Sequence, residues 1–151
     1  MRFYRIADSR FEPQSGDGAR LHGARWNSPG RAVIYACETL SGAMLEKLVH
    51  TSGRIPKHQV CVTFESPDLL PISTITPDDA PGWDLPDMIA SRAAGDAWLR
   101  AMESAILLVP SVVFGVERNA LINPAHPDFR QINVVSIEPM RWDERLFEGH
   151  P

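Results

Sequence analysis

Short apolar runs separated by turn-forming residues dominate the hydrophobic pattern of this chain. They are rich in β-branched and aromatic side chains, and in the run 59–65 Val60, Val62 and Phe64 alternate with polar neighbours. Runs of this kind, bounded by Gly, Pro, Asn or Asp, are typical of strands, and the alternation indicates one buried face. The predicted strands are residues 3–7, 32–36, 59–65, 106–110, 111–116, 120–123 and 132–140.

Two segments have the longer apolar spacing that a helix requires. Ser41 can cap a helix that runs to His50, in which Leu45, Leu48 and Val49 fall on one face. In a second helix, predicted over 87–102, we expect Ile89, Ala93, Ala97 and Trp98 to point inward and Arg92, Asp96 and Arg100 to point outward.

Two long connections interrupt these elements. Residues 8–24 are rich in Gly, Ser and Asp, and residues 66–87 contain five prolines, so both are predicted to be loops. Strands and helices do not alternate regularly, which favours a mixed α+β fold over a doubly wound sheet. A length of 151 residues suits one domain, and we expect a single compact domain over 1–151 with mixed or antiparallel sheets.

Composition excludes several classes of protein. The net charge of −4 argues against a general nucleic-acid binder. No apolar run approaches the length of a membrane span, and the charged N-terminal segment does not resemble a signal peptide. The two cysteines, Cys37 and Cys61, do not form a disulfide framework and are expected to be small core residues. These features together predict a soluble cytoplasmic protein.

The charge is unevenly distributed along the chain. Residues 1–31 contain six arginines against three acidic residues, whereas the remainder carries a net charge of −7. The whole chain has thirteen arginines and only two lysines. Because the planar guanidinium fork suits phosphate and carboxylate groups, the N-terminal segment is compatible with a small phosphorylated ligand. Solvated surface charge explains the same composition equally well.

The densest cluster of candidate functional residues is GARWNSPGRAVIYA, residues 23–36. Arg25 and Arg31 flank an Asn-Ser-Pro turn, and strand alternation places Val33 and Tyr35 on one face of the following strand. An arginine, a glycine-lined turn and a tyrosine could bind a phosphate and stack on an aromatic base. The alternative is an ordinary turn with a structural arginine and a core tyrosine.

The segment SGAMLEKLVH places Glu46 and His50 four residues apart, on one helical face beside the predicted apolar stripe. A carboxylate there could be partly buried and serve chemistry, or it could be an exposed glutamate with a histidine near the helix C-terminus. One Glu and one His do not complete a zinc site, and no metal site is predicted.

Two further segments carry polar residues among apolar ones. Ser111 follows a proline in VPSVVF, but it is not in a G-x-S-x-G elbow and is not predicted to be a hydrolase nucleophile. In NALINPAHPDF, residues 119–129, the side chains of Asn119, Asn123 and His126 could hydrogen-bond a ligand or cap turns.

Taken together, these segments resemble the RES-domain toxins of bacterial RES–Xre toxin–antitoxin pairs. The family is named for an arginine, a glutamate and a serine, and the matching positions are Arg25 in GARWNSPGR, Glu46 in GAMLEKLVH and Ser111 in VPSVVF. The segments FYRI, VIYA and NPAHPDF also resemble the family, so the likeness extends from about residue 2 to about residue 147.

The resemblance implies a compact fold similar to that of ADP-ribosyltransferases, with NAD+ as substrate and an Xre-like antitoxin that covers the active site. It places Arg25 at the NAD+ phosphates or ribose, Tyr35 against nicotinamide and Glu46 at a ribose hydroxyl. Glu46 lies early and on a predicted helix, whereas many ADP-ribosyltransferases have their glutamate late and on a strand.

Four further residues are assigned to the NAD+ site by the same resemblance. His50 would support Glu46 or contact the acceptor, and Ser111 would position NAD+ by a hydrogen bond. Arg5 and Arg31 are additional candidates for the phosphates.

The candidate residues and the resemblance lead us to consider three functions. The first is an NAD+ glycohydrolase or phosphorylase that breaks the nicotinamide–ribose bond, and the second is a mono-ADP-ribosyltransferase that modifies a metabolic enzyme. The third is a non-enzymatic binding module in which arginine and glutamate merely pair. We expect no direct nucleic-acid partner and no membrane partner.

Overall fold

The computed structural model describes residues 1–147, and the last four residues of the predicted domain lie outside the described part. The strands are β1 (Arg2–Asp8), β2 (Ile34–Cys37), β3 (Gln59–Glu65), β4 (Ile72–Thr74), β5 (Ile106–Pro110), β6 (Arg118–Ile122) and β7 (Asn133–Pro139). The helices are α1 (Asp17–His22), α2 (Leu40–Leu48) and α3 (Ile89–Ala101), with short 3-10 turns η1 (Pro127–Gln131) and η2 (Glu144–Leu146).

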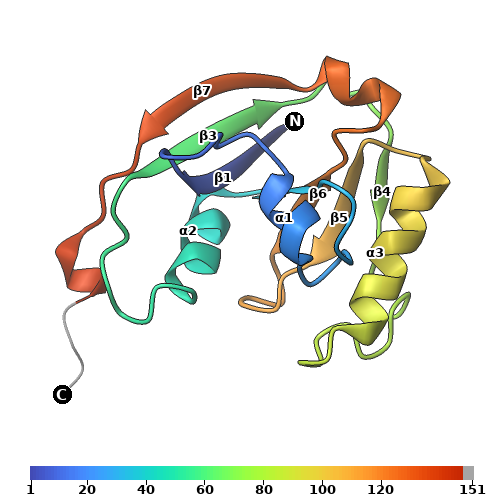
Figure 1. The fold of residues 1–151 in the computed structure, drawn as a ribbon, viewed down its shortest axis with the longest axis horizontal. Helices are drawn as coiled ribbons and strands as arrows, with labels where there is room; N and C mark the ends of the chain where they lie inside the picture. Colours follow the sequence, from blue (N-terminus) through green and yellow to red (C-terminus); the bar gives the residue numbers. More distant parts are fainter. Residues whose placement is uncertain (148–151) are drawn as a thin grey trace.

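All seven strands belong to one sheet in the order β4-β5-β6-β2-β1-β3-β7. Every pairing is antiparallel except that of β4 with β5, so the sheet is mixed. Figure 1 shows β1, β3 and β7 above α2, with β4 and β5 beside α3. The predicted α+β class and mixed sheet are therefore confirmed.

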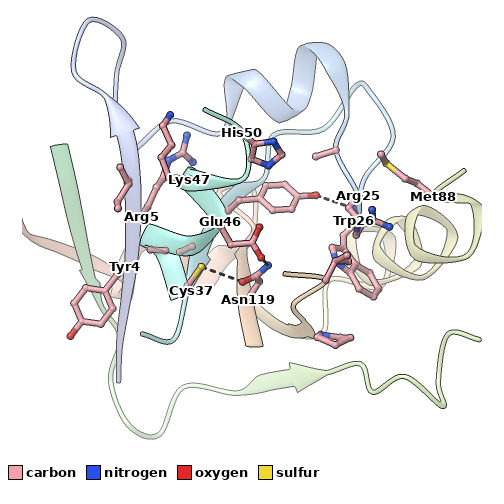
Figure 2. Close-up of a pocket in the computed structure, with 17 residues that line it drawn as sticks. Tyr4, Arg5, Arg25, Trp26, Cys37, Glu46, Lys47, His50, Met88 and Asn119 are labelled. Atoms are coloured by element: carbon pink, nitrogen blue, oxygen red, sulfur yellow. Dashed lines mark hydrogen bonds between the residues drawn. The ribbon is translucent and has the colours of Figure 1, made fainter. Parts of the chain in front are cut away.

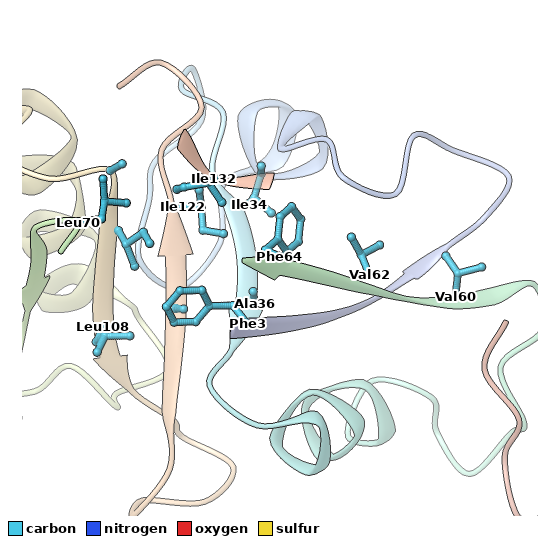
Figure 3. Packing of buried hydrophobic residues seen from close by; sticks show 13 residues of the cluster. Phe3, Ile34, Ala36, Val60, Val62, Phe64, Leu70, Leu108, Ile122 and Ile132 are labelled. Atoms are coloured by element: carbon cyan, nitrogen blue, oxygen red, sulfur yellow. The ribbon is translucent and has the colours of Figure 1, made fainter. Parts of the chain in front are cut away.

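One face of the sheet encloses the larger core. Phe3 and Phe64, from β1 and β3, pack with Ile34, Leu108 and Ile122 from the other half of the sheet. Figure 3 shows these side chains between strands that cross at a large angle, so the sheet curves around its own core. The predicted burial of Val60, Val62 and Phe64 is confirmed.

A second core cluster lies on the opposite face of β2, β5 and β6. It consists of Trp26, Val33, Ala80, Trp98, Leu99, Leu107, Val109 and Leu121. Tyr35 packs against this cluster, whereas Ile34 and Ala36 lie in the larger one, so the predicted alternation along β2 is confirmed. Helix α3 covers this face, and Gly95 lets it approach closely, since a Cβ there would lie 1.8 Å from the Trp26 carbonyl oxygen.

Helix α2 differs from its prediction in its cap and in its buried face. It begins at Leu40 because the Thr39 hydroxyl, not that of Ser41, accepts the hydrogen bond from the Gly42 N–H. It ends at Leu48 rather than His50. Of the predicted apolar face, Leu48 is half-buried but Leu45 and Val49 are 41% and 57% exposed, because the helix packs its small residues Gly42 and Ala43 inward.

Helix α3 is also rotated relative to its prediction. Ile89, Ala93 and Ala97 are exposed, and the buried side is Ser91, Gly95, Trp98 and Leu99. Two residues predicted to face solvent instead bond to the 23–36 segment. Asp96 accepts hydrogen bonds from the backbone N–H and hydroxyl of Ser28, and Arg92 donates to the Ala24 carbonyl.

The predicted strand over 111–116 is wrong. Strand β5 ends at Pro110, and the Ser111 hydroxyl then accepts hydrogen bonds from the backbone N–H groups of Val113 and Phe114, both at 3.2 Å. This local bonding turns the chain away from the sheet.

The two segments predicted to be loops also contain regular elements. Helix α1 lies within residues 8–24, and strand β4 lies within residues 66–87.

The helices of residues 1–147 include none that is both long enough and apolar enough to span a membrane.

Candidate functional site

A cavity of about 600 Å³ opens between α2, the strands β1, β2 and β6, and the segment 24–26. It is lined by Tyr4, Arg5, Ile6, Ala24, Arg25, Trp26, Tyr35, Ala36, Cys37, Ala43, Glu46, Lys47, His50, Met88, Pro110, Val112 and Asn119. Five predicted site residues therefore lie together: Arg5, Arg25, Tyr35, Glu46 and His50. Figure 2 shows Glu46 in the middle of the cavity, with Arg5 and Lys47 to one side and Arg25 to the other.

Two hydrogen bonds fix the Glu46 carboxylate through the same oxygen. Its Oε1 accepts from the Ser111 hydroxyl and from Nδ2 of Asn119, each at 2.8 Å. Its Oε2 accepts no hydrogen bond from residues 1–147. The carboxylate is thus oriented by the protein while one oxygen stays available to a ligand.

The local fold explains why Glu46 is here. Helix α2 follows β2 directly and packs against β1 and β2 through Gly42 and Ala43. Glu46 lies one turn after Gly42 and Ala43, so it points toward the end of the sheet where β5 and β6 meet α2. The rotation that exposes Leu45 and Val49 therefore also directs Glu46 inward.

Ser111 does not line the cavity. It is 3% exposed, and its hydroxyl accepts from two backbone N–H groups and donates to Glu46. The expected direct hydrogen bond from Ser111 to NAD+ does not follow from this arrangement, because the oxygen is fully engaged inside the protein.

Arg25 connects the cavity to the loop before α3. Its Nη1 donates to the carbonyl oxygens of Trp83 and Leu85, both at 3.1 Å. The neighbouring Trp26 stacks on Trp83, with ring centroids 5.9 Å apart. Arg25 thus holds this loop in place, and the rest of its guanidinium is available to a ligand.

Tyr35 is held by two hydrogen bonds at the wall of the cavity. Its hydroxyl donates to Oδ1 of Asn27 at 2.8 Å and accepts from the Trp26 backbone N–H at 3.1 Å. Burial raises the pKa of the Tyr35 hydroxyl, so it stays protonated. Its ring therefore has a fixed position and can act as a flat apolar surface.

Three basic side chains surround the other side of Glu46. Arg5 is half-buried and forms no hydrogen bond or ion pair within the described residues, and burial lowers the pKa of its guanidinium. Burial also lowers the pKa of Lys47, against the opposing effect of the Asp8 carboxylate and with a smaller contribution from Arg5. His50 completes this group on the cavity wall. A desolvated cation without a carboxylate partner favours an anionic ligand.

Arg31 lies away from the cavity. It is exposed, and its Nη1 donates to the carbonyl of Leu99 in the last turn of α3. This contact satisfies a helix-end carbonyl and places a positive charge at the negative end of the helix. The structure therefore does not bring Arg31 to the ligand site predicted for it.

Sequence reasoning missed the roles of Asn119 and Lys47. The sequence indicates only that Asn119 could hydrogen-bond a ligand or cap a turn, whereas it lies in strand β6, directly opposite Cys37. Asn123 and His126 of the segment 119–129 cap turns through the backbone N–H groups of Ala125 and Asp128. Lys47 follows Glu46 and could have been found by its place beside Gly42 and Ala43, the small buried residues of α2.

In the part of the chain that the structure describes, no group of three His, Cys, Asp or Glu side chains is arranged to hold a metal ion.

Comparison with family models matches residues 2–143 to the RES domain. The chain belongs to the RES-domain family of toxins. It is 40% identical over 153 residues to the Prs ADP-ribosylating toxin of a Sphingobium species, with 95% of each chain covered. It is 34% identical to Toxin Res of Yersinia enterocolitica, covering 97% of this chain and 99% of that one. It is also 32% identical to Toxin Res of Photorhabdus laumondii, covering 99% of both.

A solved structure has the same fold. The chain matches the crystal structure of the M. tuberculosis MbcT–MbcA toxin–antitoxin complex with a TM-score of 0.77 and 18% sequence identity. The match covers 97% of this chain and 86% of that chain. The resemblance noted from the sequence is therefore confirmed at the level of family and fold.

Proposed function

We propose that this chain is the toxin of a toxin–antitoxin pair and consumes NAD+ by breaking its nicotinamide–ribose bond. The observation that supports this most is the arrangement of Glu46. Its carboxylate is anchored through Oε1, has a free Oε2, and stands in a cavity of about 600 Å³ among basic side chains. That combination suits a dinucleotide with negative phosphates and a ribose that becomes positively charged during reaction.

The residues divide into two tasks. Arg5 and Lys47 face the cavity as desolvated cations, and we assign them to the pyrophosphate, whereas Arg25, on the other side of Glu46, is assigned to a phosphate or the ribose. Tyr35 provides a flat surface for the nicotinamide ring, and Glu46 accepts a hydrogen bond from a ribose hydroxyl through Oε2. His50 stands where it can contact the acceptor.

The chemistry requires little proton transfer. The bond between the ribose anomeric carbon and the nicotinamide nitrogen breaks, and its electron pair goes to the ring, which leaves as neutral nicotinamide. The ribose passes through an oxocarbenium-like state, as in glycoside hydrolysis. The negative charge of Glu46 stabilises that state, and fixed groups aimed at developing charge are a large source of rate enhancement. Water or phosphate then attacks the anomeric carbon, and attacking water releases its proton to solvent.

A second candidate is transfer of ADP-ribose to a protein. The relative that is 40% identical over nearly the whole chain is named an ADP-ribosylating toxin, which favours this alternative. The same cavity would activate NAD+, and only the acceptor would change. A non-enzymatic binding module would instead bind a ligand at this cavity and leave NAD+ intact.

We also propose an antitoxin partner of the Xre-like class that covers the cavity. The structural neighbour was solved as a toxin–antitoxin complex, which supports a partner of this kind. NAD+ is an intracellular metabolite, so the proposed site of action is the bacterial cytoplasm.

The test is to incubate purified protein with NAD+ in four conditions, with and without phosphate and with and without cell lysate. Free ADP-ribose indicates hydrolysis, a phosphorylated sugar product indicates phosphorolysis, and a labelled protein indicates transfer. Unchanged NAD+ in every condition would contradict the enzymatic proposal and favour the binding module.

Binding can be tested independently of turnover. Arg5→Gln removes a cation from the cavity wall, whereas Arg31→Gln removes one outside it. A charge-assisted contact contributes roughly 1.5–3 kcal/mol, so Arg5→Gln should weaken NAD+ affinity by about tenfold or more. Arg31→Gln should leave it unchanged. Calorimetry that shows equal affinity for both variants would remove Arg5 from the phosphate site.

A further inference from the structure

Glu46 is the end of a short chain of hydrogen bonds that begins at a cysteine. The Cys37 thiol donates to Oδ1 of Asn119 at 3.2 Å, and Nδ2 of the same amide donates to Oε1 of Glu46 at 2.8 Å. Cys37 and Asn119 are directly opposite each other in the β2–β6 ladder. Figure 2 shows Cys37, Asn119 and Glu46 in this order. The sheet register itself therefore sets the distance between thiol and amide.

We propose that Asn119 is a positioning residue for the Glu46 carboxylate and that Cys37 sets the orientation of the Asn119 amide. The importance of these two hydrogen bonds for catalysis rests on the proposed function. Their effect on the orientation of Glu46 does not depend on it. Because Asn119 donates its hydrogen bond to Oε1, Oε2 is the oxygen that remains exposed to the substrate.

The amide can serve Glu46 in only one orientation. Its Nδ2 end donates and its Oδ1 end accepts. If the amide were reversed, Oδ1 would face the Glu46 carboxylate oxygen, and two acceptors would repel each other. A donor on the Cys37 side stabilises the useful orientation, and the S–H group supplies it.

Cys37 is suited to remain a donor. The thiol is 5% exposed, and burial, together with the charges of Glu46 and Glu117, raises its pKa to about 12. It therefore keeps its proton at neutral pH. A buried thiol of this kind is unreactive, and its use here is as a small hydrogen-bond donor.

Ser111 cannot replace Asn119. Both are donors to Oε1, but Ser111 follows β5 whereas Asn119 lies in β6. Two donors from two different elements hold the carboxylate before substrate arrives, and such preorganisation lowers the barrier of the chemical step. With one donor removed, the carboxylate can rotate, so the loss should appear in kcat rather than in KM.

The first test changes the donor. Asn119→Asp keeps the shape but replaces Nδ2 with an oxygen, and Asn119→Ala removes the group without adding charge. Hydrogen bonds to charged groups are strong enough that losing one should lower kcat on NAD+ by about tenfold or more. KM should stay within about twofold of its original value. Asn133→Asp, an exposed change of the same kind in β7, is the matched control and should leave kcat unchanged.

The second test changes the orienting group. Cys37→Ser retains a donor and should keep kcat near that of the original protein, whereas Cys37→Ala removes the donor and should lower it several-fold. Cys61→Ala in β3 controls for the loss of a thiol as such. Equal kcat for Cys37→Ser and Cys37→Ala, with both folded, would overturn the role of Cys37.

The third test does not depend on turnover. Crystal structures of the original protein, Asn119→Ala and Cys37→Ala should show Glu46 in one conformation in the first and displaced or in several conformations in the variants. An unmoved Glu46, or Asn119 variants with undiminished kcat, would overturn the proposal. If the original protein leaves NAD+ intact, the proposed function fails, and the crystal structures still decide whether Asn119 positions Glu46.

Discussion

At the scale of single residues, the charge and the shape of Glu46 can be separated by one substitution. In Glu46→Gln the amide oxygen can still accept from Ser111 and Asn119, so the side chain keeps its position and loses only its charge. Turnover of NAD+ should fall by on the order of a hundredfold or more, because a preorganised electrostatic contribution is lost. The measurement is the rate of nicotinamide release.

Binding is the control for this variant. NAD+ affinity, measured by calorimetry, should change far less than turnover, since Glu46 is assigned to the reacting ribose and the basic residues to the phosphates. Near-normal nicotinamide release would exclude Glu46 from the mechanism. A large loss of affinity with a small loss of turnover would reassign it to binding.

Arg25 is predicted to have two measurable functions. Its Nη1 holds the carbonyls of Trp83 and Leu85, and lysine cannot reproduce the guanidinium fork. Arg25→Lys should therefore lower the free energy of unfolding by about 1–2 kcal/mol, as expected for one or two lost hydrogen bonds. It should also weaken NAD+ binding by about tenfold.

Denaturant unfolding and calorimetry together separate these two effects. Unchanged stability would mean that the Trp83 loop does not need Arg25. Unchanged affinity in a destabilised variant would mean that Arg25 is purely structural and that the phosphates are held by Arg5 and Lys47.

At the scale of elements, the close approach of α3 to the 23–36 segment gives a sharp stability test. A Cβ at Gly95 would lie 1.8 Å from the Trp26 carbonyl oxygen, so α3 must move if this glycine is replaced. Gly95→Ala should cost about 1–3 kcal/mol of unfolding free energy through overpacking, although alanine is the better helix former.

Gly18→Ala in α1 is the matched control, since a Cβ there would meet nothing within 4 Å. It should be neutral or slightly stabilising, by up to about 1 kcal/mol. Thermal or denaturant unfolding would show both effects. Equal stability of the two variants would contradict the tight packing of α3 on Trp26.

The sequence predicted strands better than helix faces, for a physical reason. In a strand such as 59–65 the buried face can be identified from the sequence, because successive side chains point to opposite faces. The apolar residues Val60, Val62 and Phe64 therefore mark the face that packs in the core. Helix α2 packs through Gly42 and Ala43, which carry almost no hydrophobic signal, and it leaves Leu45 and Val49 exposed. Hydropathy alone therefore selected the wrong face.

Several residues of the candidate site could be predicted from the sequence, but the hydrogen bonds between them could not. Arg25, Glu46 and Ser111 could be identified by resemblance, and the cavity brings the first two together. The contact of Ser111 with Glu46 spans 65 residues, and the contact of Asn119 with Glu46 spans 73. Such contacts depend on strand order and register, which no local pattern specifies.

At the scale of the whole molecule, the proposed activity predicts a growth phenotype. Expression of this chain alone should arrest a bacterial host and lower its NAD+, and co-expression of the proposed Xre-like antitoxin should restore growth. The basic residues around the cavity would attract an acidic group or a chain-terminal carboxylate of the proposed antitoxin, so we expect removal of the antitoxin's C-terminal end to abolish protection. Growth curves and cellular NAD+ are the measurements.

Glu46→Gln is the control here as well, because it should accumulate as folded protein without arresting growth. Normal growth with abundant folded original protein and undiminished NAD+ would contradict the NAD+-draining activity. If lysate proteins also carried no ADP-ribose, protein modification would be excluded too, and the binding module would be the better account.

The long separation between Glu46 and its anchoring residues has a consequence for the timing of synthesis. Asn119 is translated 73 residues after Glu46. At about 5–20 residues per second, the ribosome needs roughly 4–15 s to cover that interval. A nascent chain therefore contains Glu46, the proposed catalytic carboxylate, for several seconds before the strand that carries Asn119 is synthesised. Under the proposed function, the 73-residue separation of Glu46 and Asn119 along the chain gives an interval in which the antitoxin can bind the toxin before Glu46 is oriented.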